Sequence, residues 1–145
     1  LHTSLGNRYW ARNNWSSYVP EDPKPQTHRR IIYYNYKDSG EQDFWRFRGR
    51  VKRAMTESGY PSRVSVLVCN SGCNGNVVQV RFHHDGFTGQ SSDYDEPLQN
   101  MIASYNEIYG DDSYAQDSAK MAESLEENGR SIRHHEYLPE LSSNW

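Results

Sequence analysis

The stretch that decides the fold is residues 63–84, RVSVLVCNSGCNGNVVQVRFHH. Valine recurs at every second position in its first half and again early in its second half, at Val64, Val66, Val68, Val78 and Val80. Such alternation is typical of a half-buried β-strand, and the Gly, Asn and Ser residues between the halves are typical of a turn. The stretch therefore predicts two antiparallel strands joined as a hairpin.

Two turns can connect these strands. A two-residue Asn-Gly turn at 74–75 suits the backbone, because both residues tolerate a positive φ, but it divides the valines between the two faces. A three-residue loop at 70–72 keeps the valines together and sets Cys69 opposite Cys73. We therefore expect this second register, or a longer loop of the same parity, and a disulfide between Cys69 and Cys73. So short a loop limits the stabilisation to about 2 kcal/mol.

The residues before the hairpin predict a strand and a helix. Residues 29–37, RRIIYYNYK, are β-branched or aromatic and favour a strand. Apolar residues at spacings of three and four follow over 43–58, which is typical of an amphipathic helix. Residues 39–42 have the spacing of a capping box, and Gly59 is a suitable C-terminal cap.

The residues after the hairpin predict a helical region and a last strand. Helical spacing covers 97–127, with an interruption at 110–112, and SIRHHEYL at 131–138 favours a strand. The resulting order, β-α-β-β-α-β, is the split β-α-β or ferredoxin-like arrangement. We therefore expect an α+β two-layer sandwich, with an antiparallel sheet of about four strands in the order 4-1-3-2 and helices on one face.

The chain divides into three segments by composition. Residues 1–28 are rich in proline and aromatic residues and are interpreted as an N-terminal arm. Residues 29–138 form the single α/β domain, and residues 139–145 form a polar tail. Only 34% of the 145 residues are hydrophobic, below the roughly 45–50% of typical globular chains. We therefore expect a thin core in which many of the eleven tyrosines are buried.

Charge and hydropathy narrow the partners and the location. A net charge of −3 argues against non-specific nucleic-acid binding, and no apolar run approaches the roughly 20 residues of a membrane span. Asn14-Trp15-Ser16 is a glycosylation sequon with Asn14 as its acceptor. Because the chain begins at Leu1 rather than at a methionine, we expect a processed product. Together with the paired cysteines, these features predict a secreted, extracellular protein.

Two histidine pairs are the candidate catalytic residues: His83 and His84, followed by Asp85, and His134 and His135, followed by Glu136. Imidazole beside a carboxylate can bind a metal or transfer protons. In the expected strand order the pairs lie about 10 Å apart on one face, too far for one metal ion. The alternative is that strand alternation sends neighbouring histidines to opposite faces. The cysteine and histidine spacing matches no standard zinc site, so no metal is expected.

A basic helix face is the candidate binding surface, formed by Arg46, Arg50 and Arg53. It either recognises an acidic partner or is simply solvated. An RNA-binding sheet is the other possibility, because Tyr33 and Phe82 are strand aromatics. The strand that contains Phe82 lacks the basic-Gly-aromatic-Gly-aromatic run of the RNP1 pattern, which argues against RNA.

The order of elements resembles that of small secreted fungal proteins of the killer-toxin type. The resemblance depends on RRIIYYNYK, the helix at 43–58, the hairpin, the helical region at 97–127 and SIRHHEYL. It implies an α/β sandwich with split β-α-β topology that is secreted and trimmed by dibasic proteases. It transfers no functional residue.

Three functions follow from the sequence. The first is a secreted, non-enzymatic toxin or effector without a cofactor, which binds a cell-surface or host protein or glycan. The second is a small hydrolase or nuclease that uses the histidines. The third is an intracellular interaction domain with a ferredoxin-like fold. The redox state of Cys69 and Cys73 in natively produced protein distinguishes the compartments.

Overall fold

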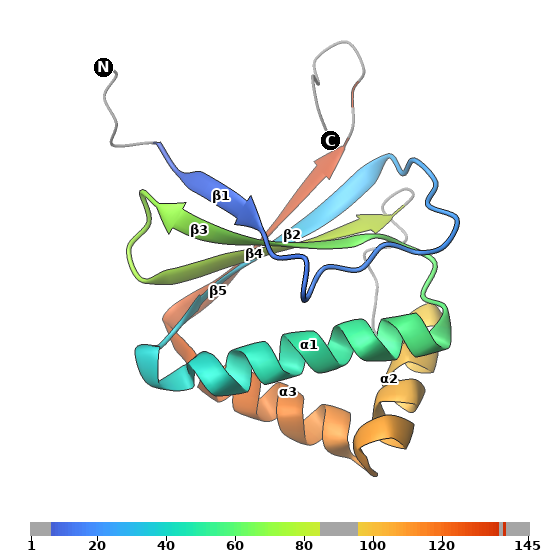
Figure 1. The fold of residues 1–145 in the computed structure, drawn as a ribbon. Coiled ribbons are helices and arrows are strands. Elements are labelled where there is room, and N and C mark those ends of the chain that lie inside the picture. Colours follow the sequence, from blue (N-terminus) through green and yellow to red (C-terminus); the bar gives the residue numbers. More distant parts are fainter. Residues whose placement is uncertain (1–6, 85–95, 137, 139–145) are drawn as a thin grey trace.

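The computed structural model describes residues 7–84, 96–136 and 138 (Figure 1). Five strands form one open antiparallel sheet in the order β1-β3-β4-β2-β5. The strands are β1 (Tyr9–Arg12), β2 (His28–Tyr36), β3 (Val64–Ser71), β4 (Asn76–His84) and β5 (Leu125–Glu136). The helices are α1 (Glu41–Ser58), α2 (Glu96–Tyr109) and α3 (Ser113–Glu123).

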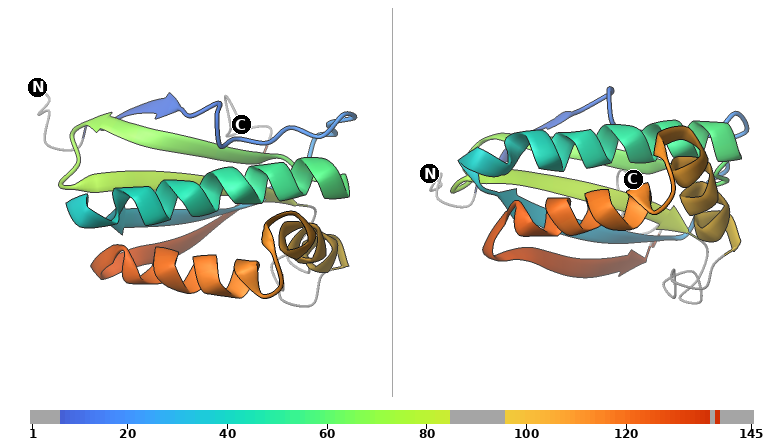
Figure 2. Two further views of the ribbon diagram at one scale, coloured as in Figure 1. Left: turned by 60° about the horizontal axis from the view of Figure 1, so that its bottom comes forward. Right: turned by 90° about the horizontal axis from the view of Figure 1, so that it is seen from below.

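The α+β class is confirmed, and the sheet has five strands where about four were expected. The four strands predicted from the sequence lie in the order β5-β2-β4-β3. The additional strand, β1, comes from the segment interpreted as an N-terminal arm. All three described helices lie against one face of the sheet, and none of them lies on the opposite face (Figures 1 and 2).

The hairpin keeps its valines on one face, as predicted. Val66 pairs with Val80 and Val68 pairs with Val78, a register with the expected parity and a longer loop. The three-residue loop is therefore wrong, because parity alone is enough to keep the valines together. The Cys69–Cys73 disulfide is present, with 6.4 Å between the two Cα atoms.

Helix α1 ends as predicted but begins differently. Gly59 adopts a left-handed φ of 68° and donates a hydrogen bond to the Thr56 carbonyl, at 3.4 Å. At the other end, Gly40 is the N-cap and no side chain caps the helix. The predicted capping box at 39–42 is wrong, because Ser39 lies inside a short 3-10 turn, Asp38–Gly40, that precedes the helix.

The boundary between α3 and β5 lies earlier than predicted. Helix α3 ends at Glu123, and β5 already begins at Leu125, which pairs with Tyr36 of β2. The strand predicted at 131–138 is present as part of β5 up to Glu136, but its expected start at 131 and the expected helix end at 127 are wrong. Leu125 fits the helical spacing of α3, but its backbone pairs with β2 and its side chain packs against the core. A register shift between Tyr34 and Tyr36 accommodates the early part of the strand.

The N-terminal segment closes the β3 edge of the sheet. After β1, the Asn13 amide donates to the Val66 carbonyl at 2.8 Å, and the Tyr18 amide donates to the Val64 carbonyl at 2.7 Å. The Val66 amide donates to the Ser17 hydroxyl at 2.9 Å, so a side chain replaces a backbone acceptor. Tyr18 is buried in the core. These contacts pair backbone groups that an exposed edge would leave open.

The core lies between the helices and the sheet and is strongly aromatic. Tyr34 of β2 packs edge-on against Phe44 of α1, with ring centres 5.5 Å apart. Phe47 of α1 packs against Tyr105 of α2 at 6.1 Å. The core therefore places the even-numbered residues of β2 toward the helices, and the odd-numbered residues lie on the opposite face, which we call the open face although Ile31 is buried there.

Candidate functional site: the open face of the sheet

The pairing of the strands divides the predicted histidines between the two faces of the sheet. His83 of β4 and His135 of β5 both pair with Arg29 of β2, which lies between them on the open face. His84 and His134 occupy the neighbouring positions, whose side chains lie on the helix side. Alternation therefore brings one histidine of each pair together.

Arginine residues accompany these two histidines on the open face. Ile31 of β2 pairs with Arg81 of β4 and Arg133 of β5, so a second row crosses the sheet beside the first. Arg12 of β1 pairs with Leu67 of β3 farther along the same face. We call this surface the cationic face, and it consists of Arg12, Arg29, Arg81, Arg133, His83 and His135.

The hydrogen bonds of Arg12 and Arg81 are made to neutral groups. The Arg12 guanidinium donates to the Ser65 hydroxyl at 3.1 Å and to Asn14 Oδ1 at 3.0 Å. The Arg81 Nε donates to Gln79 Oε1 at 2.7 Å. No ion pair joins Arg12, Arg81 or Arg133 to any carboxylate in the described part of the chain. Their charges therefore remain available to an external anion.

An aromatic pair lies beside the arginines. Trp10 of β1 packs edge-on against Tyr33 of β2, with ring centres 6.3 Å apart. The Arg133 guanidinium lies 5.6 Å from the centre of the Tyr33 ring, in a cation–π contact. The face thus combines planar apolar surfaces with planar hydrogen-bond donors.

Burial and nearby positive charge lower the pKa of both histidines of the cationic face. Burial, followed by the charges of Arg63 and Arg29, lowers the pKa of His83 to about 4. Burial, followed by Arg29 and Arg133, also lowers the pKa of His135. At neutral pH both imidazoles are therefore uncharged, and the arginines carry the positive charge of the face.

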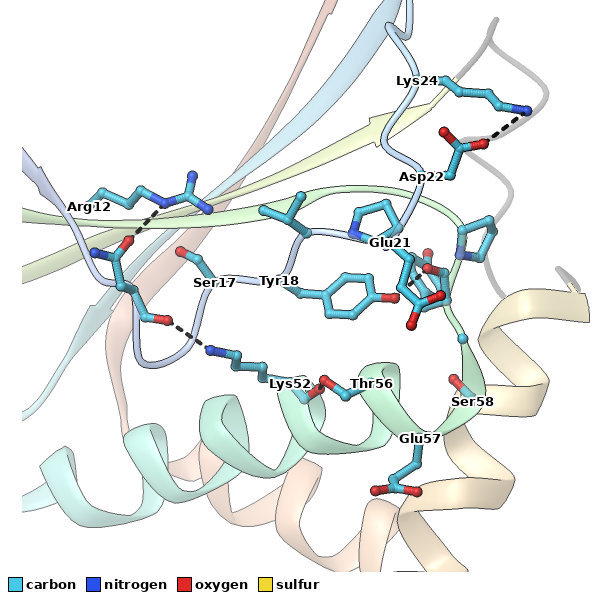
Figure 3. A pocket seen from close by; sticks show the side chains of 16 residues that line it. Arg12, Ser17, Tyr18, Glu21, Asp22, Lys24, Lys52, Thr56, Glu57 and Ser58 are labelled. Carbon is cyan, nitrogen blue, oxygen red and sulfur yellow. Dashed lines mark hydrogen bonds and ion pairs between the residues drawn. The ribbon is translucent and has the colours of Figure 1, made fainter.

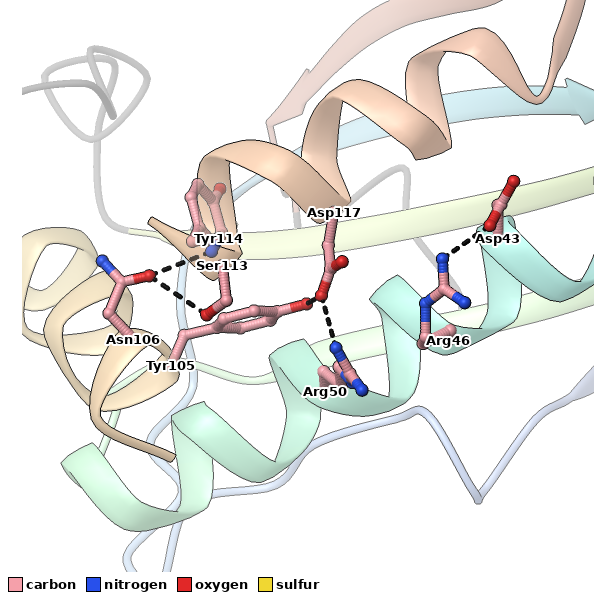
Figure 4. A network of polar contacts seen from close by, with 8 residues as sticks. All are labelled: Asp43, Arg46, Arg50, Tyr105, Asn106, Ser113, Tyr114 and Asp117. Carbon is pink, nitrogen blue, oxygen red and sulfur yellow. Dashed lines mark hydrogen bonds and ion pairs between the residues drawn. The ribbon is translucent and has the colours of Figure 1, made fainter. Parts of the chain in front are cut away.

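The basic helix face predicted on α1 is partly neutralised. Arg46 pairs with Asp43 at 2.6 Å on the same helix. Arg50 pairs with Asp117 of α3 at 2.7 Å (Figure 4). Its guanidinium also lies 4.3 Å from the centre of the Tyr109 ring. Arg53 lies 6.0 Å from the same ring centre. A binding role for these arginines stays a prediction, and the contacts of Arg50 hold helices together.

Asp117 is the centre of that helix contact (Figure 4). The Tyr105 hydroxyl of α2 donates to Asp117 Oδ2 at 2.6 Å, so one carboxylate joins all three helices. Burial alone would raise the pKa of Asp117, but the hydrogen bonds from Tyr105 and Arg50 lower it below its ordinary value. Burial and the bond to Asp117 raise the pKa of Tyr105. The cluster therefore holds the three helices together.

A hollow of about 900 Å³ lies between the N-terminal segment and the C-terminal half of α1 (Figure 3) and is a second candidate site. Several of its polar groups bond to one another. Lys52 donates to the Asn14 carbonyl at 2.9 Å, and Lys24 lies 3.8 Å from Asp22. The exposed side chain of Asn14 lies at this hollow, so a glycan attached there would project beside it. These internal contacts make the hollow a weaker candidate than the cationic face.

The cysteines and histidines were considered as metal ligands in the sequence, and their arrangement can now be described. Within residues 7–84, 96–136 and 138, no group of three or more His, Cys, Asp or Glu side chains is arranged to hold a metal ion. Cys69 and Cys73 are bonded to each other, which removes both thiols from metal binding or nucleophilic chemistry. Asp85 lies outside the described residues.

Comparison with protein-family models, with curated proteins and with solved structures found no match. None of the described helices combines the length and apolar character needed to cross a bilayer. No residue role is therefore transferred from another protein, and the functional interpretation depends on the site itself.

Sequence reasoning identified the histidines but missed the arginines of the cationic face. Arg29, Arg81 and Arg133 lie on three strands that are distant in the sequence, and only strand pairing makes them neighbours. A signal was present for two of them. Arg81 lies two residues before His83, and Arg133 lies two residues before His135, so strand alternation places each arginine on the same face as its histidine.

Proposed function

We propose that this protein is a secreted, non-enzymatic binding protein of the toxin or effector type, which recognises an acidic cell-surface glycan through the cationic face. The observation that carries the proposal is the set of arginines, Arg12, Arg81 and Arg133, without a carboxylate partner in the described part of the chain. Guanidinium groups bind carboxylate and sulfate oxygens through paired hydrogen bonds.

The aromatic residues of the cationic face suit a glycan ligand. The rings of Trp10 and Tyr33 offer flat apolar surfaces against which sugar rings can pack. The net charge of −3 opposes long-range attraction of any polyanion, so the local charge of the arginines has to supply the attraction. The disulfide is compatible with an extracellular location. Within this proposal, the four-stranded part of the sheet is a ferredoxin-like scaffold that β1 extends.

The proposal is tested by calorimetric titration with a sulfated glycosaminoglycan, a polyuronate, a neutral glucan and a single-stranded oligonucleotide. We expect binding to the two acidic glycans, no binding to the glucan, and weaker binding to the oligonucleotide. The double variant R81Q/R133Q should lower the affinity for the acidic glycans at least tenfold. The matched control R53Q removes an arginine from α1 and should leave the affinity unchanged. Equal affinities for R81Q/R133Q and wild type, or preferential oligonucleotide binding, would contradict the proposal.

A histidine-dependent hydrolase is the second candidate, and one observation favours it. His83 and His135 lie on either side of Arg29, so two neutral imidazoles flank a cation that can bind a phosphate or sulfate ester. They are separated by two strand spacings, about 10 Å, which is long for action on a single bond. Cleavage of an ester by the wild type that is lost in both His83→Ala and His135→Ala would establish this function instead.

A further inference from the structure

Arg48 of α1 is a buried cation without an acidic partner among the described residues. Its side chain is 4% exposed, and its Nε has no hydrogen-bond partner in the described part of the protein. No ion pair joins Arg48 to a described carboxylate. Buried charges in proteins are normally paired, because removing an unpaired charge from water is costly. A cation in this position is therefore suited to a partner that arrives from outside.

Arg48 lines a cavity of about 520 Å³ between the three helices and the helix-facing side of the sheet. This volume falls in the range of roughly 300–1,000 Å³ that small-molecule pockets occupy. Much of the remaining lining is apolar and includes Leu98, Met101 and Met121. Methionine side chains adapt their shape, so such a wall accepts a flexible chain.

The charges around the cavity are all positive. Among the described residues that line it, Arg30, Arg48 and Arg130 are the charged ones, and no aspartate or glutamate is present. Burial lowers the pKa of Arg48, and the neighbours that partly oppose this effect are the tyrosines, first Tyr34 and then Tyr114. The cavity thus pairs an unneutralised guanidinium with a long apolar wall.

We propose that this cavity binds a medium-chain or long-chain carboxylate, whose head group pairs with Arg48 and whose alkyl chain lies along the Leu98, Met101 and Met121 wall. A carboxylate matches the planar fork of the guanidinium and neutralises it, and burial of the chain removes apolar surface from water. Arg48 is on the helix side of the sheet, so this site is separate from the cationic face and does not depend on its function.

The test is calorimetric titration of the full chain with decanoate below its micelle concentration, compared with decanol. Decanol has the same alkyl chain and an uncharged head group. We expect the wild type to bind decanoate at least tenfold more tightly than decanol. Arg48→Met should remove this preference, whereas the matched control Arg53→Met on the same helix should retain it.

Two further measurements keep the test decisive. Arg48→Met removes a buried charge, so the free energy of unfolding without ligand should not decrease. Decanoate should raise the melting temperature of the wild type and of Arg53→Met, but not that of Arg48→Met. Met121→Trp fills the cavity, leaves Arg48 in place and should also abolish decanoate binding. Equal affinity for decanoate and decanol, an unchanged preference in Arg48→Met, or the absence of binding to the wild type would overturn the proposal. Loss of binding in R81Q/R133Q would also overturn it, because decanoate would then occupy the cationic face.

Discussion

Removal of the Asp117 carboxylate should destabilise the protein more than any other change to the contact between the helices. In Asp117→Ala the hydroxyl of Tyr105, whose side chain is 0% exposed, loses its acceptor, and Arg50 loses its ion pair. A hydrogen bond to a charged group is worth about 1.5–3 kcal/mol. The Arg50 side chain is 33% exposed, so its ion pair adds only about 0.5–1 kcal/mol. The expected loss is about 2–4 kcal/mol in the free energy of unfolding.

Urea unfolding of Asp117→Ala, Tyr105→Phe and the double variant measures this effect as a double-mutant cycle. Tyr105→Phe alone should cost about 1–2 kcal/mol, because the carboxylate keeps its bond to Arg50. In the Asp117→Ala background the same substitution should be neutral or stabilising, since the unpaired hydroxyl disappears. The two losses would simply add if the hydroxyl and carboxylate did not interact, and that result would refute the reasoning.

The same contact has a definite pH dependence. The native pKa of Asp117 lies below its ordinary value of 3.8, so the stabilisation is fully present above pH 3.8 and is lost as the pH falls through the native pKa. The difference in free energy of unfolding between the wild type and Asp117→Ala should therefore become smaller in acid. A difference that stayed constant from pH 6 to pH 2 would contradict the assignment.

Three further predictions concern separate parts of the chain. In Gly49→Ala the new methyl group would overlap the exposed ring of Trp15, so the indole NMR signal of Trp15 should shift. A gain of about 1 kcal/mol in helix propensity limits any loss of stability. An unmoved Trp15 signal would argue against this packing. Replacing both Cys69 and Cys73 by Ser should cost at most about 2 kcal/mol in urea unfolding and leave the fold intact, whereas global unfolding would show that the bond does more than close a local loop. The pKa of His83 falls from 6.5 in the unfolded chain to about 4 in the folded protein, so the free energy of unfolding should decrease as the pH drops from 6.5 to 4. His83→Gln should reduce this pH dependence. An NMR titration of His83 with a midpoint near 6.5 would contradict the prediction.

The sequence predicted the elements whose signals are local. Alternating valines in β3 and β4 set the register parity because a slip by one residue would expose them, and Gly59 marked the end of α1 because few other residues adopt a left-handed φ so readily. These signals depend on neighbours in the chain. They could therefore be interpreted without knowledge of the fold.

The elements that depend on distant partners could not be predicted in this way. Strand β1 is four residues long, and its pairing with β3 is visible only once the β3 edge exists. Leu125 continues the helical spacing of α3, but its pairing with Tyr36 places it in β5. The cationic face has the same origin, because Arg81 and Arg133 become neighbours of Arg29 only through strand pairing.

The most direct test of the cationic face is NMR titration of the protein with a sulfated glycosaminoglycan fragment. We expect the guanidinium signals of Arg81 and Arg133 to shift on binding. We also expect the pKa of His83 to rise from about 4, because a bound anion offsets the charges that lower it. Shifts confined to Arg46, Arg50 and Arg53 of α1, with the pKa of His83 unchanged, would contradict the proposal that the open face of the sheet binds the ligand.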